Sequence, residues 1–543
     1  MDFDKFLEKE YAPYVILLSV ALTFYALIYL FSGDFSIGSH NWYNNYSRQA
    51  YSWIQGRLDL PYNRPYLEIA FFGDRMYISF PPFPSIFLLP FVVFYGYNTP
   101  DHAIALGLTL ITLIYAYKIA FKLLKEKKLA IFFTLFLVLG TNYLHISLWG
   151  AVWWLAQNMG FTFLMISIYY AISDSKKHSA ISLFALCASM GCRPFNALYL
   201  PVILLLIFKR EEGRLFTIFR RILVYAIPAI ALGAVYMWLN YARFGSILEF
   251  GHNYLPEHTY DPLGQFHSSR VVYNLSMMFF NFDLTHGIIN GFPHYRAYGF
   301  TTFAFWIASP MFLCFVVYQF IYWNRKKETD EGVIYIESAE ADVEATYLKP
   351  EETDEKAVYI KASEPYEETA YTDTEYPTEE LINAYLNDAS KFMMDTDLDY
   401  LQGEGASAVE AKAMSDIGNA SDNPLDEITD KSSDAATISE TLASPFRYFK
   451  EGAIENFLLK LIPVLVFLHI FAFSFHRTLG GRQFGSRYIA DSLPIVFLGL
   501  LLMVAKLPKI KHMMLNFIPF LFGALINFHG TIMFLTFYFP FDR

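Results

Sequence analysis

Cysteine and the common catalytic motifs are scarce in this sequence of 543 residues. Its three cysteines, Cys187, Cys192 and Cys314, lie in or beside apolar runs, and their spacing fits neither a disulfide framework nor a metal site. The sequence contains no glycine-rich phosphate loop followed by Lys-Ser/Thr, no Gly-x-Ser-x-Gly and no His-Glu-x-x-His. A basic soluble domain is also lacking, so no nucleic-acid partner is predicted.

Charged residues are few as well, at 17 % of the chain, whereas soluble domains contain about 25 %. Hydrophobic residues make up 55 % of the sequence. The 54 phenylalanines and 39 tyrosines are typical of proteins whose aromatic rings lie at membrane interfaces. The composition therefore predicts an integral membrane protein.

Apolar runs recur along the chain, and a helix needs about 20 apolar residues to cross a bilayer. We predict an all-α polytopic membrane protein with about eleven transmembrane helices. The predicted spans lie near residues 12–32, 102–121, 129–147, 151–171, 179–192, 195–208, 222–241, 299–322, 454–474, 493–505 and 514–537. Between the short neighbouring spans 179–192 and 195–208, Arg193-Pro194 forms either a tight outer turn or a break within the membrane.

Lysine-rich connections give the orientation of these spans. Clusters such as Lys122–Lys128 and Lys506–Lys511 fall on one side of the predicted bundle, which the positive-inside rule makes the cytoplasmic side. The N-terminus is then inside and the C-terminus outside. The apolar segment Pro81–Gly96 is short and interrupted by prolines, so we predict helices that lie along the outer interface.

The predicted outer loops contain arginine but no lysine. The first loop covers 33–101, the second covers 243–298, and a short third loop covers 475–492. A guanidinium binds phosphate or carboxylate through two parallel hydrogen bonds, which an ammonium cannot do. These arginines therefore either hold an anionic ligand or pair with acidic residues at the interface.

An acidic insert divides the chain into three regions. Residues 328–440 contain 31 acidic and 6 basic residues. Low hydrophobicity and high net charge predict disorder. We therefore expect a transmembrane region at 1–327, a disordered cytoplasmic insert at 328–450 and a C-terminal transmembrane region at 451–543.

Motifs of the first loop follow one another in a familiar order. Gly56-Arg57 closes a short predicted helix, Gly-Asp-x-x-Tyr follows at Gly73–Tyr77, and Pro81-Pro82 opens the interfacial helix. With NYARFGSILEFGHNY (Asn240–Tyr254) and GGRQFGSRYIADSLP (Gly480–Pro494), they resemble the GT-C superfamily of polytopic membrane glycosyltransferases. The resemblance is to a bacterial branch of the protein O-mannosyltransferase and lipid A aminoarabinose transferase type, and covers most of the chain outside the acidic insert.

This resemblance implies transfer of a sugar from a polyprenyl-phosphate donor to an acceptor hydroxyl on the outer face, with inversion at the anomeric carbon. The acceptor is then an envelope glycan, lipid or protein, and the transferase is a multi-pass protein of the bacterial plasma (inner) membrane. Such a reaction needs a carboxylate as general base and cationic groups for the departing phosphate. No cofactor is implied.

The general base is where this sequence departs from the superfamily, whose members place a carboxylate shortly before the glycine that closes the first loop helix. The corresponding position holds Asn41. Asp34, at the predicted exit of the first span, is our first choice for the base, with an ordinary helix-terminal residue as the alternative. Asp74 is the second choice, with a turn residue paired to Arg75 as the alternative. Glu68 is a further carboxylate of this loop.

Arginines of the predicted outer side are the candidates for binding the donor phosphate. Arg482 and Arg487 are preferred, with a turn stabilised by pairing to Asp491 as the alternative reading. Arg75 and Arg193 are further candidates. Asn142, His145, Gln157 and Asn158, towards the outer ends of the third and fourth spans, either line the pocket or bond across helices. The pocket-lining candidates are His145 and Asn158 of this group, together with Asn41 and Tyr488.

Three histidines of the second loop, His252, His258 and His267, raise the question of a metal site. Their spacing matches no compact ligand motif, and loop histidines are more often simple hydrogen-bonding residues. No metal site is predicted.

Two other functions remain compatible with the sequence. A transporter or lipid-linked-sugar flippase usually shows inverted repeats and broken helices near the midplane, and no similarity between the two halves is found here. A non-catalytic membrane protein with a GT-C-like fold would account for the asparagine at position 41.

Overall fold

The structure, a computed structural model of the chain, describes residues 3–32, 36–64, 66–211, 215–281, 284–289, 292–297, 304–330, 431–480, 484–507 and 512–538. The chain divides into two units, Met1–Ile334 together with Ala443–Arg543, and Tyr335–Leu442. Most of the insert at 328–450, predicted to be disordered, lies outside the described residues, and that expectation stays a prediction. The helix bundle and its cavity belong to the first unit.

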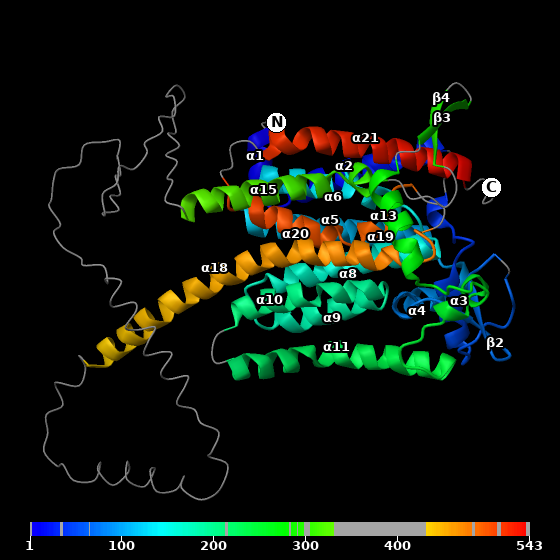
Figure 1. The fold of residues 1–543 in the computed structure, drawn as a ribbon, viewed down its shortest axis with the longest axis horizontal. Coiled ribbons are helices and arrows are strands. Elements are labelled where there is room, and N and C mark those ends of the chain that lie inside the picture. The colour runs from blue at the N-terminus through cyan, green and yellow to red at the C-terminus, as the bar shows by residue number, and fades with distance from the viewer. Residues whose placement is uncertain are drawn as a thin grey trace, which may run out of the picture. The chain divides into compact units, whose positions relative to one another are not determined.

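Helices dominate the described chain (Figure 1). The longer ones are α2 (Ala12–Ser32), α5 (Asp101–Leu124), α6 (Lys127–Leu139), α8 (Val152–Ala171), α9 (His178–Met190), α10 (Leu200–Arg210), α11 (Leu215–Phe244), α15 (Met311–Asp330), α18 (Lys431–Ser474), α20 (Leu493–Val504) and α21 (His512–Tyr538). Each apolar segment predicted from the sequence overlaps one of these helices. Two predicted spans are not single helices, because α6 ends at Leu139 within 129–147 and α15 begins only at Met311 within 299–322. The shorter helices α1 (Phe3–Glu8), α7 (Tyr143–Ser147) and α14 (Phe305–Ala308) lie before or between them.

Five described helices, α2, α5, α11, α18 and α21, contain stretches long and apolar enough to cross a membrane. Three of them carry large apolar side chains on their outer surfaces. Phe31 on α2 is 64 % exposed, Trp238 on α11 is 61 % exposed and Ile518 on α21 is 75 % exposed. Soluble monomers rarely show large contiguous apolar surfaces, because water disfavours them. The chain is therefore an all-α membrane-embedded protein, as its composition predicts.

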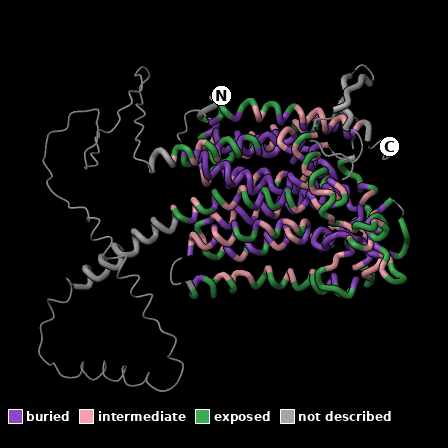
Figure 2. Tube along the Cα trace, viewed as in Figure 1, coloured by how far each residue is buried: buried purple, intermediate pink, exposed green. Residues whose placement is uncertain are grey.

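The centre of the bundle is formed by helices that are apolar on every side. Helix α20 has the sequence LPIVFLGLLLMV, and all of its residues are buried. It packs against α15, and α8 packs against α5 and α9. A helix that is hydrophobic all round belongs in the interior of a bundle. Figure 2 shows such buried helices between partners whose outward sides are exposed.

The first loop folds into short elements at one end of the bundle, on the right in Figure 1. They are η1 (Ser36–Gly38), α3 (Asn45–Ile54), β1 (Ile69–Phe72), β2 (Arg75–Ile78), α4 (Phe83–Tyr95) and η2 (Gly96–Asn98). Strands β1 and β2 are antiparallel, and Phe72 pairs with Arg75 across a turn in which Gly73 has φ +58°. Glycine tolerates this left-handed conformation at little cost. The helix predicted within Pro81–Gly96 is α4.

The second and third loops lie at the same end. Their elements are η4 (His252–Tyr254), α12 (Pro256–Thr259), η5 (Ser268–Arg270), α13 (Val271–Phe280), β3 (Leu284–Ile289), β4 (Phe292–Ala297) and α19 (Arg487–Ala490). The two loops are joined through their backbones. His267 N donates to Phe475 O at 2.9 Å, and Arg477 N donates to Gln265 O at 2.8 Å. These bonds fix the segment after α18 against the second loop.

Between α9 and α10 the chain makes a turn rather than a continuous helix. Arg193 has an extended backbone, and η3 (Pro194–Tyr199) follows it. Proline at the first position of η3 suits this start, because its missing N–H would have no partner there. The two helices contact each other, which favours a turn at Arg193-Pro194, and its placement relative to the membrane stays a prediction.

Candidate functional site

A cavity of about 1510 Å³ lies among the three loops and the helix ends beneath them. Aromatic side chains form much of its wall, including Trp153 and Trp154 at the start of α8 and Tyr488 on α19. Charged and polar groups from distant parts of the chain also line it. They are Glu68, Arg193, Glu249, His252, Asn253, Glu257, His258, Gln265, Asn274, His476, Arg477, Thr478 and Arg487.

Glu68 is the carboxylate that the first loop contributes to this cavity. It immediately precedes β1, and its Oε1 accepts a hydrogen bond from the indole Nε1 of Trp153 at 3.0 Å. The pKa of Glu68 is raised to about 7, chiefly by burial and also by Glu257, while the Trp153 bond and Arg487 act in the opposite direction. Desolvation disfavours a charged carboxylate, which is the usual cause of such a shift. Near neutral pH this group can both accept and release a proton.

Arg193 lines the cavity and forms an ion pair with the buried carboxylate of Asp491. Its Nε lies 2.8 Å from Asp491 Oδ2, and the Asp491 side chain is only 1 % exposed. The other carboxylate oxygen, Oδ1, accepts a bond from Gln157 Nε2 at 2.7 Å. The guanidinium carbon of Arg193 also lies 5.1 Å from the centre of the Tyr488 ring, within the range of cation–π attraction. Arg193 is thus held rigidly at the cavity wall.

Arg487, on α19, also lines the cavity and lies close to the ring of Tyr488. Its Nη2 donates to Gly480 O at 2.7 Å, and its guanidinium carbon lies 5.5 Å from the Trp154 ring and 5.1 Å from the Tyr488 ring. Burial lowers the pKa of Arg487, and the positive charge of Arg193 lowers it too. An anionic ligand between them would relieve this repulsion.

An apolar hollow of about 520 Å³ adjoins the cavity. It shares Pro194 and Phe195 with the cavity wall and continues along η3 and α10 to Leu465 on α18. Its other wall residues are Ala197, Leu198, Leu200 and Pro201. A cavity that contains charged groups, with an apolar groove beside it, suits a ligand with a charged head and a hydrocarbon tail.

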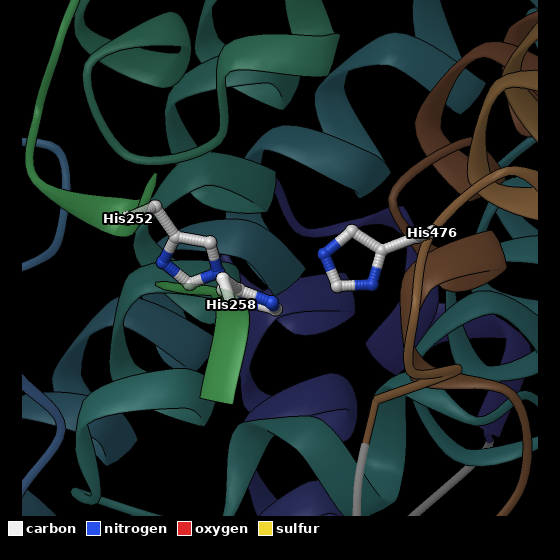
Figure 3. A group of neighbouring side chains, drawn as sticks. All are labelled: His252, His258 and His476. Atoms are coloured by element: carbon white, nitrogen blue, oxygen red, sulfur yellow. The ribbon is translucent and has the colours of Figure 1, made fainter. Parts of the chain in front are cut away.

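Three histidines meet in the cavity wall (Figure 3). His252 and His258 belong to the second loop, and His476 follows α18; each offers a ring nitrogen within 4.8 Å of those of the others. Burial lowers the pKa of His252 to about 3 and the pKa of His476 to about 4. The pKa of His258 is lowered as well, chiefly by burial. Burial therefore favours the neutral form of all three rings.

The candidate residues from the sequence are distributed unevenly over this site. Arg193, Arg487 and Tyr488 line the cavity. Asp74 and Arg75 lie at the exposed β1–β2 turn and are not among the described residues of its wall. Asp34 and Arg482 lie outside the described residues, so their assignment as base and phosphate ligand stays a prediction.

The other pocket candidates are buried beneath the cavity. Asn41 donates through its side chain to His102 Nε2 at 3.2 Å. Asn158 accepts a bond from Tyr143 Oη at 2.7 Å, and His145 stacks edge-on against Phe534 at 4.8 Å between ring centres. These contacts are of the kind expected from the second reading, in which such residues bond and pack across helices.

Sequence reasoning gave no special place to Glu68 and did not consider His476. The only local signal for Glu68 is the hairpin that follows it, with its Gly-Asp turn at Gly73-Asp74, because a hairpin fixes the chain before its first strand. His476 follows directly on an apolar span, in FSFHR, where a histidine leaves the membrane segment. Neither signal states which distant residues the side chain will meet.

No protein-family model, curated protein or solved structure matches the chain. We therefore infer the chemistry of the cavity from its own groups. It combines a carboxylate whose pKa burial raises to about 7, the guanidiniums of buried Arg487 and half-buried Arg193, and an adjoining apolar groove. Such a site can remove a proton from a hydroxyl and hold a phosphate that carries a lipid.

Proposed function

We propose that this chain is a GT-C-type glycosyltransferase that moves a sugar from a polyprenyl-phosphate donor to an envelope glycan, lipid or protein. The proposal includes eleven transmembrane helices, a cytoplasmic N-terminus, and an active site on the outer face of a bacterial plasma (inner) membrane. One observation carries it: a first-loop carboxylate, Glu68, shares a cavity with Arg193 and Arg487. Glu68 takes the role of the general base for which Asp34 was the first choice from sequence.

The transfer step assigns each group one task. Glu68 accepts the proton of the acceptor hydroxyl as its oxygen attacks the anomeric carbon of the sugar. The bond between that carbon and the phosphate oxygen breaks, and the electron pair leaves with the phosphate. Attack opposite the leaving group inverts the anomeric carbon. Glu68 then loses the proton to solvent, which its pKa of about 7 permits.

The departing phosphate needs stabilisation by positive charge. Arg193 and Arg487 flank Tyr488 at the cavity wall, so a lipid phosphate at this place would meet two guanidiniums. Fixed donors aimed at developing charge are among the largest contributions to enzymatic rate. The hollow beside Pro194 and Phe195 offers the hydrocarbon tail an apolar path along α10.

The position of the cavity favours a transferase over a transporter or flippase. Transporters place their substrate near the bilayer midplane, between broken helices. This cavity lies among the loops at one end of the bundle, near the start of α8 and the turn after α9. Protease mapping or tagging that placed the first loop in the cytosol would contradict the proposed outer active site.

The proposal can be tested in cells that lack this protein. We expect such cells to accumulate a polyprenyl-phosphate sugar and to lose one sugar from an envelope glycan, lipid or protein, because the donor is no longer consumed. Mass spectrometry of extracted lipid-linked sugars and of envelope fractions measures both changes. Restoration by the native chain provides the control. Unchanged donor lipids and unchanged envelope sugars would contradict the proposal.

The rate of transfer is expected to rise with pH through about 7. The base must be deprotonated to accept a proton, and burial raises the pKa of Glu68, so the active form is lost as pH falls through about 7. One pH unit below that value, the rate should be roughly tenfold lower than on the plateau. Initial rates in membranes loaded with donor lipid give the profile, and thermal unfolding at each pH serves as the control for stability. A flat profile through neutrality would exclude Glu68 as the base.

A further inference from the structure

The three histidines of the cavity wall meet although they come from separate loops. His252 lies in η4 and His258 in α12, whereas His476 lies between α18 and α19. The ring centres of His252 and His258 are 5.0 Å apart, and those of His258 and His476 are 5.9 Å apart. Figure 3 shows His252 and His258 on one side and His476 opposite them. Such convergence places up to three imidazole nitrogens around one point.

Two of the rings are oriented by backbone carbonyls. His252 Nδ1 lies 3.3 Å from Ser79 O, and His476 Nδ1 lies 2.7 Å from Thr478 O and 3.1 Å from Thr478 N. A bond from one ring nitrogen to a carbonyl is the usual second contact of a metal-binding histidine, because it fixes the ring and leaves the other nitrogen as the ligand. At His476 the other ring nitrogen is Nε2, which lies 3.0 Å from the side-chain amide nitrogen of Gln265. A metal ion bound to Nε2 would displace this amide.

The third ring, that of His258, has a buried nitrogen without a hydrogen-bond partner among the described residues. His258 is only 7 % exposed, and its Nδ1 makes no hydrogen bond to any residue that the structure describes. Buried polar atoms are rarely left in this state, because the lost contact with water is costly. A metal ion would supply the missing contact.

We propose that His252, His258 and His476 bind one divalent transition-metal ion of the zinc type, with a fourth coordination position open to the cavity. Three imidazoles suit zinc, whereas magnesium and calcium prefer oxygen ligands. Nitrogens bound to tetrahedral zinc lie about 3.3 Å apart, given Zn–N distances of about 2.0–2.1 Å. The nitrogens now lie within 4.8 Å of one another, so the rings would draw closer together on binding the ion.

The ion would add a further link between the second loop and the segment after α18, which backbone bonds and side-chain contacts such as Arg477 Nε to Asp261 Oδ2 at 2.9 Å already join. Its open position would bind water or an oxygen of an anionic ligand, as at other three-ligand zinc sites. The inference does not depend on the proposed transfer reaction, which requires no metal. Metal content, rather than activity, is therefore its test.

The test uses the full chain, purified with an affinity tag that lacks histidine and reconstituted in lipid nanodiscs. After removal of metal with a chelator, the protein is titrated with Zn²⁺, and bound metal is counted by mass spectrometry. We expect about one Zn²⁺ per chain. Loss of an outer partner already costs about 10- to 100-fold in metal affinity, so loss of a ligand in His258→Asn or His476→Asn should cost at least about 100-fold.

His267→Asn is the matched control, because His267 lies on the same loop but is only half-buried and is bonded to Ser269. This variant should bind Zn²⁺ as the native chain does. The native chain loaded with Co²⁺ provides a test that needs no variant, since tetrahedral cobalt with nitrogen ligands absorbs strongly in the visible range. Absence of both Zn²⁺ binding and this absorption in the native chain would overturn the inference. Equal Zn²⁺ affinity in the native chain and in a well-folded His258→Asn variant would do the same.

Discussion

Replacing Glu68 with glutamine is expected to lower the rate of sugar transfer by about 100- to 10,000-fold, the contribution of a positioned general base. Glutamine keeps the shape of the side chain and an oxygen that accepts the bond from Trp153 Nε1. What it loses is the ability to take the proton of the acceptor hydroxyl. The measurement is the initial rate of product formation in nanodiscs that contain the donor lipid.

Protein stability separates this chemical role from a structural one. The pKa of Glu68 is raised in the folded state, so the folded protein favours the protonated form, and this stabilisation is lost as pH rises through about 7. Above that pH the native side chain is a buried anion, which glutamine replaces without charge. The variant should therefore unfold at the same temperature as the native protein or higher at pH 8, while its activity is largely lost.

Asp59→Asn is the matched control from the same loop. Asp59 forms a surface ion pair with Arg57 at 2.7 Å and is not among the described residues of the cavity wall. The Asp59→Asn variant should retain nearly full transfer activity. Asp34→Asn completes the series: full activity of Glu68→Gln together with loss of activity in Asp34→Asn would move the base to Asp34 and contradict the role of Glu68.

The helices of this protein were predictable because each is encoded locally. An apolar run as uniform as Leu493–Val504 has one stable place, inside a bundle or a bilayer, whatever its neighbours are. Prolines at Pro81-Pro82 likewise mark the start of α4 without reference to the rest of the chain. Sequence alone therefore located the helices, while the orientation and the number of crossings stay predictions.

The cavity was not predictable in the same way, because its groups are joined by contacts between distant segments. Glu68 reaches the cavity because the β1–β2 hairpin follows it and Trp153 of α8 donates to it. His476 reaches it because Arg477 N bonds to Gln265 O. Spacing along the chain does not encode such pairings, so the three histidines showed no metal-like pattern in the sequence.

The ion-pair partner of Asp491 was likewise not predictable from the sequence. The sequence offered a turn in which Arg482 or Arg487 pairs with this carboxylate. In the structure Asp491 pairs with Arg193, whose place depends on the turn between α9 and η3. Arg487 instead donates to Gly480 O. The fold, and not proximity along the chain, selects which arginine is fixed by the carboxylate.

Asp491→Asn is expected to destabilise the protein by about 3–5 kcal/mol, because removing one partner of a buried ion pair leaves the other charge buried without compensation. The Asp491 side chain is 1 % exposed and that of Arg193 is 17 % exposed, so water can replace little of the lost interaction. Thermal unfolding of the detergent-purified chain, followed by intrinsic fluorescence at a fixed heating rate, measures the change.

Two variants decide whether the loss reflects this pair. Asp174→Asn breaks the ion pair with Lys122, in which the Asp174 side chain is 95 % exposed, and should cost less than about 1 kcal/mol. In the double variant Arg193→Gln with Asp491→Asn, no buried charge is left alone, so its loss should be smaller than that of Asp491→Asn alone. Additive losses in the double variant would show that the two side chains act independently. In that case the rigid placement of Arg193 at the cavity would have to come from Tyr488 rather than from its carboxylate.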